Sequence, residues 1–206
     1  MRVTVIDYKA GNLTSVIKTL RYLGAETQVT DGDLSHVTSA ERIVLPGVGH
    51  FAATERLDET DLSGAIREAI AHGVPFLGIC VGMQWLYAGS TEAPSQPGLG
   101  IFAETCTRFP EGHEKVPHVG WNSLEPRPGS RLFSGVELGE FVYFTHSYKA
   151  PVTDDTAAVT PYIEPFAAAV ERRNVFGVQF HPEKSGETGL KILKNFLSLD
   201  TKEVAC

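Results

Sequence analysis

Apolar and polar positions follow two different spacings in the first part of the chain. Residues Arg2 to Ile6 form a short β-branched run, which predicts a buried strand. The apolar residues that follow recur every three or four positions, as on one face of a helix, until Gly24 ends the pattern. They are Leu13, Val16, Ile17, Leu20 and Leu23. The predicted order is therefore strand, then helix.

The same unit repeats further along the chain. Arg42 to Leu45 predicts a second buried strand, which ends at a Pro-Gly pair. Leu62 to Ala71 predicts a helix closed by a His-Gly pair, and a third apolar run covers Val74 to Ile79. Repeated strand-helix-strand units predict an α/β fold with a mostly parallel central sheet and helices on both faces.

The second half of the chain predicts strands with tight connections. Its apolar runs are short and separated by clusters of Pro, Gly and Asp. They are Phe141 to Phe144, Ala167 to Val170 and Val175 to Phe180, and a final helix carries Leu190, Leu193, Phe196 and Leu197. Gly89 to Gly100 has the composition of a linker, but the apolar runs on either side can join one sheet. We therefore expect a loop there and a single domain over residues 1–206.

Composition and charge exclude several classes of protein. The 206 residues are 42% hydrophobic and 21% charged, so the chain can form a full core that buries about 70% of its unfolded surface. A formal net charge of −7 offers no basic surface to nucleic acid or to an anionic membrane. The N-terminal residues lack the long apolar region typical of a secretory signal, and no stretch approaches the roughly 18 apolar residues of a membrane span. Cys80, Cys106 and Cys206 form no CxxC pair, so we expect a cytoplasmic protein without a disulfide framework, metal or cofactor.

The first candidate for chemistry is Cys80, in the segment PFLGICVGMQWL. A buried strand leads into a turn in which Gly78 and Gly82 flank the cysteine, as in the G-x-S-x-G nucleophile elbow with sulfur in place of oxygen. The glycines would let neighbouring backbone pass close to a strained turn. A helix that starts there would favour the thiolate through its dipole and free N–H groups. The alternative is a small buried core cysteine.

The candidate base for Cys80 is His181. It follows the apolar run that ends at Phe180, and Pro182 restricts it to extended backbone. Because positions i and i+2 of an extended chain share one side, Glu183 can orient the imidazole. The alternative is that His181 caps a strand end and that Glu183 is a solvated carboxylate.

Leu45 to Ala52, LPGVGHFA, admits three interpretations. It fits the dinucleotide fingerprint G-x-G-x-x-A, with Glu68 about twenty residues further on, but it does not lie in the first strand-helix turn. The second interpretation is that Gly47 to Gly49 supply N–H donors to an oxyanion, together with Val81. The third is a plain glycine turn. KVPHVGWN and YFTHSY could form a binding wall, although aromatic strands more often pack a core.

Six segments, in order over nearly all of the chain, closely resemble the glutaminase subunits of imidazole glycerol phosphate synthases. These subunits are class I (triad) glutamine amidotransferases of histidine biosynthesis. The segments are DYKAGNLTS, LPGVGHF, PFLGICVGMQWL, KVPHVGWN, YFTHSY and GVQFHPEKS. The resemblance implies a flavodoxin-like class I glutamine amidotransferase fold in which Cys80, His181 and Glu183 form the catalytic triad.

The resemblance also implies the binding residues and a partner. Val48 and Val81 would lie near the oxyanion, and glutamine would be held by Gly47, Gln84, Glu92, Ser147 and Tyr148. A separate (β/α)8-barrel cyclase subunit would complete a heterodimer and use the ammonia to form imidazole glycerol phosphate and aminoimidazole carboxamide ribotide. The residues at or near its docking face would be Asn12, Trp121 and Lys184.

Three positions depart from the family pattern. Lys9 stands where glycine is usual, Val119 where methionine is frequent, and Thr145 where valine is common. The first two fall in segments that face the cyclase in the family. The alternatives are a glutaminase of another synthase, a stand-alone γ-glutamyl hydrolase, and a noncatalytic subunit with the same fold.

Overall fold

The computed structural model describes residues 1–112 and 114–199, so Cys206 lies outside the described residues. The strands are β1 (Arg2–Ile6), β2 (Glu26–Thr30), β3 (Arg42–Gly47), β4 (Phe76–Cys80), β5 (Gly89–Ser90), β6 (Thr105–Arg108), β7 (His118–Ser123), β8 (Glu125–Pro126), β9 (Phe141–His146), β10 (Tyr148–Lys149), β11 (Thr156–Thr160), β12 (Phe166–Arg172) and β13 (Val175–Val178). The helices are α1 (Leu13–Tyr22), α2 (Ser35–Thr38), α3 (Glu55–Glu59), α4 (Leu62–Ala71), α5 (Val81–Gln84) and α6 (Gly186–Ser198), with 3-10 turns η1 (Phe51–Thr54) and η2 (Pro182–Lys184).

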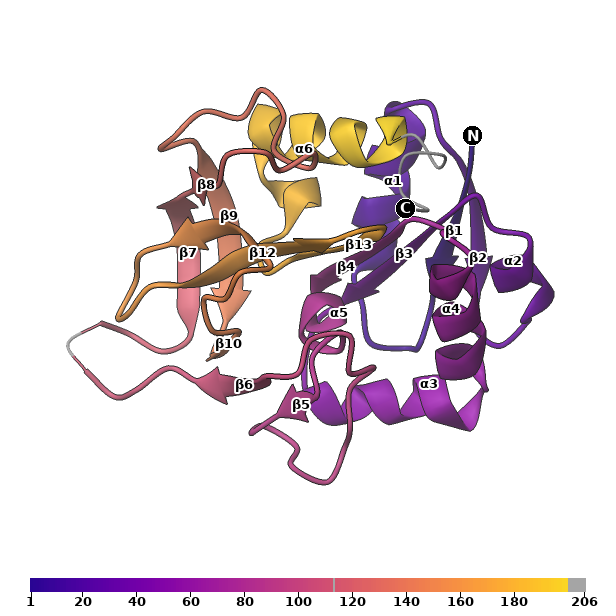
Figure 1. Ribbon diagram of the computed structural model, residues 1–206, viewed down its shortest axis with the longest axis horizontal. Coiled ribbons are helices and arrows are strands. Elements are labelled where there is room, and N and C mark those ends of the chain that lie inside the picture. The colour runs from indigo at the N-terminus through magenta and orange to yellow at the C-terminus, as the bar shows by residue number, and fades with distance from the viewer. Residues whose placement is uncertain (113, 200–206) are drawn as a thin grey trace.

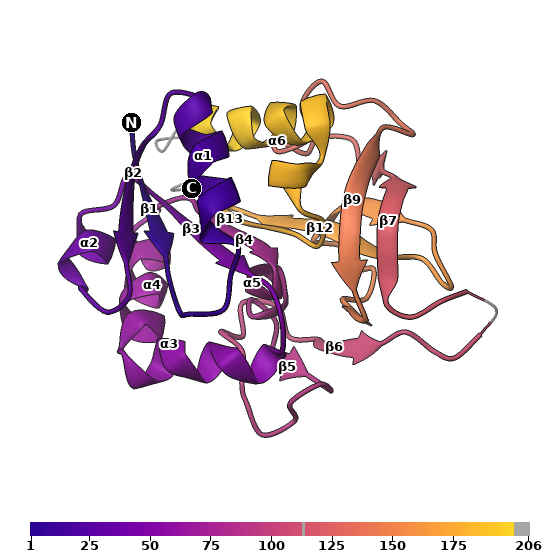
Figure 2. The ribbon, with the colours of Figure 1, turned by 180° about the vertical axis from the view of Figure 1, so that it is seen from behind.

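Within the described residues, eight strands form one sheet in the order β2-β1-β3-β4-β13-β12-β11-β8. The strands from β2 to β13 pair in parallel, and the three beyond β13 pair antiparallel. Helices α1 and α6 cover one face and α4 covers the other, as Figure 1 and Figure 2 show. The predicted α/β fold, with a mostly parallel sheet and helices on both faces, is confirmed.

Apolar stripes attach the helices to the sheet. Helix α1 buries Val16 and Leu20, and α6 packs Phe196 against Phe176 of β13, with ring centroids 6.0 Å apart. Every residue of β3 and β4 is buried, which is typical of parallel strands covered on both faces. The Asn174 side chain joins α4 to the sheet by donating to the Ile70 carbonyl at 2.7 Å.

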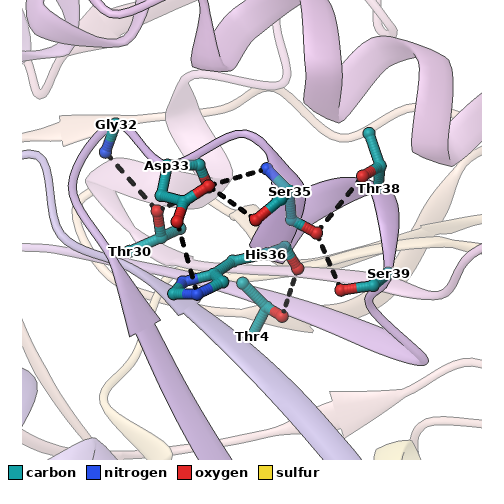
Figure 3. Close-up of polar contacts among 8 residues, drawn as sticks. All are labelled: Thr4, Thr30, Gly32, Asp33, Ser35, His36, Thr38 and Ser39. Atoms are coloured by element: carbon teal, nitrogen blue, oxygen red, sulfur yellow. Dashed lines mark hydrogen bonds and ion pairs between the residues drawn. The ribbon is translucent and has the colours of Figure 1, made fainter.

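Strand β2 was not predicted, because its sequence ETQVT carries little apolar pattern. It is an edge strand that, within the described residues, pairs only with β1, and it therefore needs few buried side chains. Polar contacts fix the chain after it (Figure 3): Asp33 accepts from the backbone N–H of Ser35 at 3.0 Å, and Thr4 of β1 donates to the His36 carbonyl at 2.8 Å. These contacts hold the single turn of α2 against the sheet.

The second half forms short strands, as predicted. Besides β8, β11, β12 and β13 of the main sheet, β7 pairs with β9, and β10, β6 and β5 form a further small sheet in the described part of the chain. The Gly89 to Gly100 segment begins with β5 and folds back through a bridge between Gly89 and Pro97. None of the helices between residues 1 and 199 that the structure describes has the length and hydropathy that a membrane crossing requires.

Candidate active site

Cys80 lies at a sharp turn between β4 and α5. Its backbone is left-handed, with φ +55° and ψ −109°, a conformation in which a residue with a side chain is strained. A Cβ added to Gly82 would lie 2.0 Å from the Leu45 carbonyl oxygen, and one added to Gly78 would lie 2.3 Å from the Gly82 carbonyl oxygen. Both flanking glycines are therefore required by close backbone packing.

Helix α5 begins directly after Cys80, as expected, but it has only four residues. The chain leaves the helix at Trp85, and Leu86 and Tyr87 continue in tight turns. A single turn has little macrodipole, because that dipole is a sum over aligned peptide units. Neighbouring side chains can therefore add to the stabilisation that the free N–H groups of this turn give to a Cys80 thiolate.

His181 and Glu183 form a buried pair. His181 Nδ1 lies 2.9 Å from Glu183 Oε1, and the two side chains are 2% and 1% exposed. The backbone N–H of His181 donates to the Tyr143 carbonyl of β9 at 2.9 Å. His181 has extended backbone, as expected, but Pro182 opens the 3-10 turn η2, so the chain does not continue extended to Glu183. The tight turn, and not a strand, brings the carboxylate to the imidazole.

The electrostatic surroundings favour a protonated His181. Burial alone would lower the pKa of its imidazolium, but Cys80 and Glu183 outweigh burial and raise the pKa to about 9. Among the described residues, His181 Nε2 has no hydrogen-bond partner. Glu183 thus holds one ring nitrogen, which leaves the other for a proton exchanged with the Cys80 side.

A cavity of about 260 Å³ opens beside Cys80. Its lining includes seven of the ten residues that the resemblance assigns to the triad, the oxyanion and glutamine binding, while Gly47, His181 and Glu183 are not among its lining residues. The lining residues are Val48, Gly49, Cys80, Val81, Gln84, Glu92, Pro117, Thr145, His146, Ser147 and Tyr148. Gly47 is closely packed, because a Cβ there would lie 2.1 Å from the Tyr8 hydroxyl oxygen.

Two of the cavity side chains already hold other parts of the structure. Glu92 Oε2 accepts from the backbone N–H of Phe51 at 2.8 Å, which ties the Gly89 to Gly100 loop to η1. Gln84 donates both hydrogens of Nε2, to the Tyr148 carbonyl and to Gln179 Oε1, each at 3.0 Å. The Gln84 atom that remains for a ligand is therefore Oε1, which can only accept.

Val48 differs from its predicted role. Its backbone N–H donates to the Ala10 carbonyl oxygen at 3.2 Å and is thus not directed at the cavity as an oxyanion donor. The segment also leads into the 3-10 turn η1, and α3 begins only at Glu55, so no α-helix N-terminus directly follows Gly49 to bind a pyrophosphate. A dinucleotide site therefore gains no support from the local structure. The described residues likewise contain no group of three or more His, Cys, Asp and Glu side chains placed to hold a metal ion.

The sequence reasoning missed Gln179 and did not assign a role to His146. Gln179 is completely buried, and its Nε2 lies 3.6 Å from Cys80 Sγ. Its signal in GVQFHPEKS was a polar glutamine within the apolar run Val175 to Phe180. His146 lines the cavity beside the predicted Ser147 and Tyr148.

The three residues expected at a docking face differ in their surroundings. Trp121 on β7 is 55% exposed, and its ring lies 6.1 Å from that of Tyr143. Lys184 is exposed, with Nζ 5.7 Å from the centroid of the same Tyr143 ring. Asn12 precedes α1 and donates to Ser15 Oγ at 3.0 Å. Trp121, Tyr143 and Lys184 therefore form one aromatic and cationic surface next to the His181 segment.

The departures from the family pattern have local structural explanations. Lys9 has φ +65°, the left-handed backbone that favours glycine, and its ammonium pairs with Asp7 at 3.0 Å and Asp31 at 2.8 Å. Val119 and Thr145 are direct partners across β7 and β9. Two of the three departures are thus one cross-strand pair.

Comparisons with known proteins agree with the fold. Residues 4–199 match the family model described as glutamine amidotransferase class-I. A solved structure described as a glutamine amidotransferase has a TM-score of 0.74 at 18% identity, with 95% of this chain and 96% of that chain covered. The structure of PurLQS from Thermotoga maritima has a TM-score of 0.73 at 20% identity, with 95% and 97% covered. These similarities establish the fold.

Relatives with higher sequence identity show to which group of glutamine amidotransferases the chain belongs. The imidazole glycerol phosphate synthase subunit HisH of Salinibacter ruber is 45% identical over 212 residues, which cover 98% of this chain and 96% of that protein. HisH of Methanopyrus kandleri is 45% identical over 203 residues, which cover 96% and 98%. The chain therefore belongs to the class-I glutamine amidotransferases and, within them, to the HisH subunits of imidazole glycerol phosphate synthase.

Proposed function

We propose that this chain hydrolyses glutamine to glutamate and ammonia with Cys80, His181 and Glu183, and that it passes the ammonia to a cyclase subunit. The observation that carries the proposal is the buried His181–Glu183 pair beside Cys80. Cys80 lies at a glycine-flanked turn, and its proximity helps to raise the pKa of His181. Full-length similarity to HisH subunits supports imidazole glycerol phosphate synthase as the enzyme and histidine biosynthesis as the pathway.

In the proposed reaction, Cys80 Sγ attacks the carboxamide carbon of glutamine. The carbon–nitrogen bond breaks, and His181 Nε2 gives its proton to the departing ammonia. Water then attacks the γ-glutamyl thioester while His181 takes a proton from it, which releases glutamate and restores the cysteine. Glu183 holds the imidazole orientation and stabilises the imidazolium.

The cavity suits a small amino acid. Its volume of about 260 Å³ lies below the about 300–1,000 Å³ of pockets for drug-sized ligands. We assign glutamine binding to its polar wall and to Gly47 at the end of β3, with Gln84 Oε1 accepting from the substrate. The wall residues are Gln84, Glu92, Ser147 and Tyr148. The N–H groups of Val48 and Val81 would serve the oxyanion, Val48 only after it leaves the Ala10 carbonyl.

We propose that the partner is a (β/α)8-barrel cyclase that docks over Asn12, Trp121 and Lys184 to form a heterodimer. The exposed Trp121, its neighbour Val119 and Phe141 of β9 give this side of the β7–β9 pair an apolar surface. Residues 1–206 would act as one amidotransferase domain, and the free thiols of Cys80 and Cys106 suit the reducing cytoplasm.

The test is glutamate release from glutamine by the purified chain, alone and with a cyclase subunit and its ribotide ligand. A large rise with the partner supports the proposal. Full activity of the chain alone would indicate a self-sufficient glutaminase or γ-glutamyl hydrolase. Cys80→Ala is expected to abolish glutamate release but to leave ammonia-driven synthesis by the complex intact. Loss of both would show that the substitution disrupts docking or folding.

A further inference from the structure

The backbone carbonyl of Tyr148 accepts two hydrogen bonds, each from a different side chain. Gln84 Nε2 lies 3.0 Å from it, and His146 Nδ1 lies 2.8 Å from it. A carbonyl oxygen can only accept, so both nitrogens must carry a hydrogen that points at it. This one backbone group therefore fixes the amide orientation of Gln84 and the tautomer of His146.

The first direction leads from Tyr148 to the sulfur. Because Gln84 Nε2 also contacts the side chain of Gln179, the atom that faces it must be the acceptor Oε1, at 3.0 Å. The Gln179 amide then has only one orientation, with Nε2 directed at Cys80 Sγ at 3.6 Å. Gln84, Gln179 and Cys80 are each at most 3% exposed, so water does not compete for these contacts.

The second direction leads from Tyr148 to strand β7. Burial lowers the pKa of His146 to about 3 and that of His118 to about 4, so both rings are neutral near pH 7. His146 Nε2 must then accept, and His118 Nδ1, 3.2 Å away, must donate to it. His118 Nε2 in turn accepts from Asn122 Nδ2 at 3.3 Å.

A second backbone carbonyl anchors the far end. Asn122 Nδ2 also donates to the Pro161 carbonyl at 2.8 Å, which fixes the orientation of that amide. The result is a continuous series of contacts in which every donor is determined, and we call it the amide–histidine chain. Its members are Asn122, His118, His146, the Tyr148 carbonyl, Gln84, Gln179 and Cys80.

We propose that the amide–histidine chain positions the nucleophile, and that Gln179, its last donor, holds and stabilises the Cys80 thiolate. Since α5 is a single turn, an N–H aimed at the sulfur supplies stabilisation that a longer helix would otherwise give. Gln179 does not line the cavity, so it acts on Cys80 and not on the substrate. The proposal rests on the proposed role of Cys80.

The test is alkylation of Cys80 by iodoacetamide as a function of pH, followed by mass spectrometry of the Cys80 peptide. Gln179→Met removes the donor at similar length, and we expect alkylation at pH 7 to slow about tenfold and its pH midpoint to rise. Gln179→Glu keeps an acceptor for Gln84 but places a carboxylate beside the sulfur, so its midpoint should rise further. With the cyclase present, Gln179→Met should lower kcat for glutamine and leave KM unchanged.

Two further variants distinguish a specific effect on the position of Cys80 from a general disturbance of the fold. Gln28→Met, on the distant edge strand β2, should leave the alkylation profile unchanged. His118→Phe keeps the ring stacked between Phe144 and Tyr162 but removes the donor to His146, and it should shift the profile in the same direction by a smaller amount.

Wild-type alkylation in both folded Gln179 variants would overturn the proposal, and an unchanged profile in His118→Phe would overturn its histidine arm. Because alkylation needs no glutamine, it also separates this proposal from the proposed function. If the profile shifts in the Gln179 variants but the wild-type chain never releases glutamate, the positioning role stands and the glutaminase assignment fails.

Discussion

The backbone N–H of Val48 donates to the carbonyl oxygen of Ala10 at 3.2 Å. Val48 is the residue expected to stabilise an oxyanion, and an N–H engaged with one strong acceptor is not free for another. Gly49 follows it with φ +102°, a conformation that favours glycine and leaves the neighbouring peptide free to reorient. The structure thus holds the proposed oxyanion donor away from the site.

We expect the Val48 amide hydrogen to exchange slowly in the free chain and faster once a cyclase with its ribotide is bound. The absence of one oxyanion donor should keep the free chain about 100- to 1,000-fold below the complex in kcat. Hydrogen exchange followed by NMR measures the first quantity, and glutamate release measures the second. If the Val48 amide hydrogen exchanged fast in a free chain of low activity, the Val48–Ala10 hydrogen bond would not be the cause of that low activity.

The close packing around the Cys80 turn predicts that Gly82 cannot be replaced. In Gly82→Ala the new Cβ would lie 2.0 Å from the Leu45 carbonyl oxygen, which is backbone and cannot rotate away. We expect a loss of about 3 kcal/mol in the free energy of unfolding, measured by urea denaturation, together with loss of glutaminase activity.

Gly64→Ala is the matched control for this substitution. Gly64 lies in α4, and an added Cβ there meets nothing within 4 Å. Alanine should stabilise the helix by up to about 1 kcal/mol. Equal effects of the two substitutions would contradict the packing argument.

The protonation of His181 should depend on Cys80. Burial opposes the imidazolium, while Cys80 and Glu183 favour it and raise the pKa of His181 to about 9. Because this value is above the about 6.5 of the unfolded chain, the stabilising contribution is complete below pH 6.5 and is lost as the pH rises through about 9.

We expect Cys80→Ala to lower the pKa of His181, measured by NMR titration of the ring. The variant should also lose less unfolding free energy than the wild type between pH 6.5 and 9. A pKa that stays near 9 in Cys80→Ala would mean that Glu183 alone holds the proton, and that cysteine and histidine are not coupled.

Periodicity in the sequence was sufficient for elements that bury an apolar face. The bounds of β1 and α4 were predicted correctly, because β1 is a short β-branched run that is buried from Val3 to Ile6 and the buried residues of α4 follow a helical spacing. Strand β2 was missed because an edge strand can be polar. The length of α5 was not predicted, because the residues after it are apolar for core packing and not for a helix face.

In the candidate site, the sequence predicted the features that depend on residues close together along the chain. The turn at Cys80 and the pairing of His181 with Glu183 depend on glycine, proline and short spacings. The contact of Val48 with Ala10 joins residues far apart in sequence through backbone atoms, which side-chain patterns do not encode. The direction of Gln179 likewise depends on the Tyr148 carbonyl and could only be read from three-dimensional contacts.

The buried histidine pair predicts sensitivity of the fold to acid. Burial lowers the pKa of His118 to about 4, below the about 6.5 of the unfolded chain. Between these values the unfolded chain binds more protons than the folded chain, so the free energy of unfolding falls as the pH falls. In His118→Phe this contribution is absent, and the variant should lose about 1–2 kcal/mol less than the wild type between pH 7 and pH 5. Urea denaturation at both pH values measures the difference. Equal losses would mean that His118 does not have to shed its proton for the chain to fold, and that the neutral pair required by the amide–histidine chain is absent.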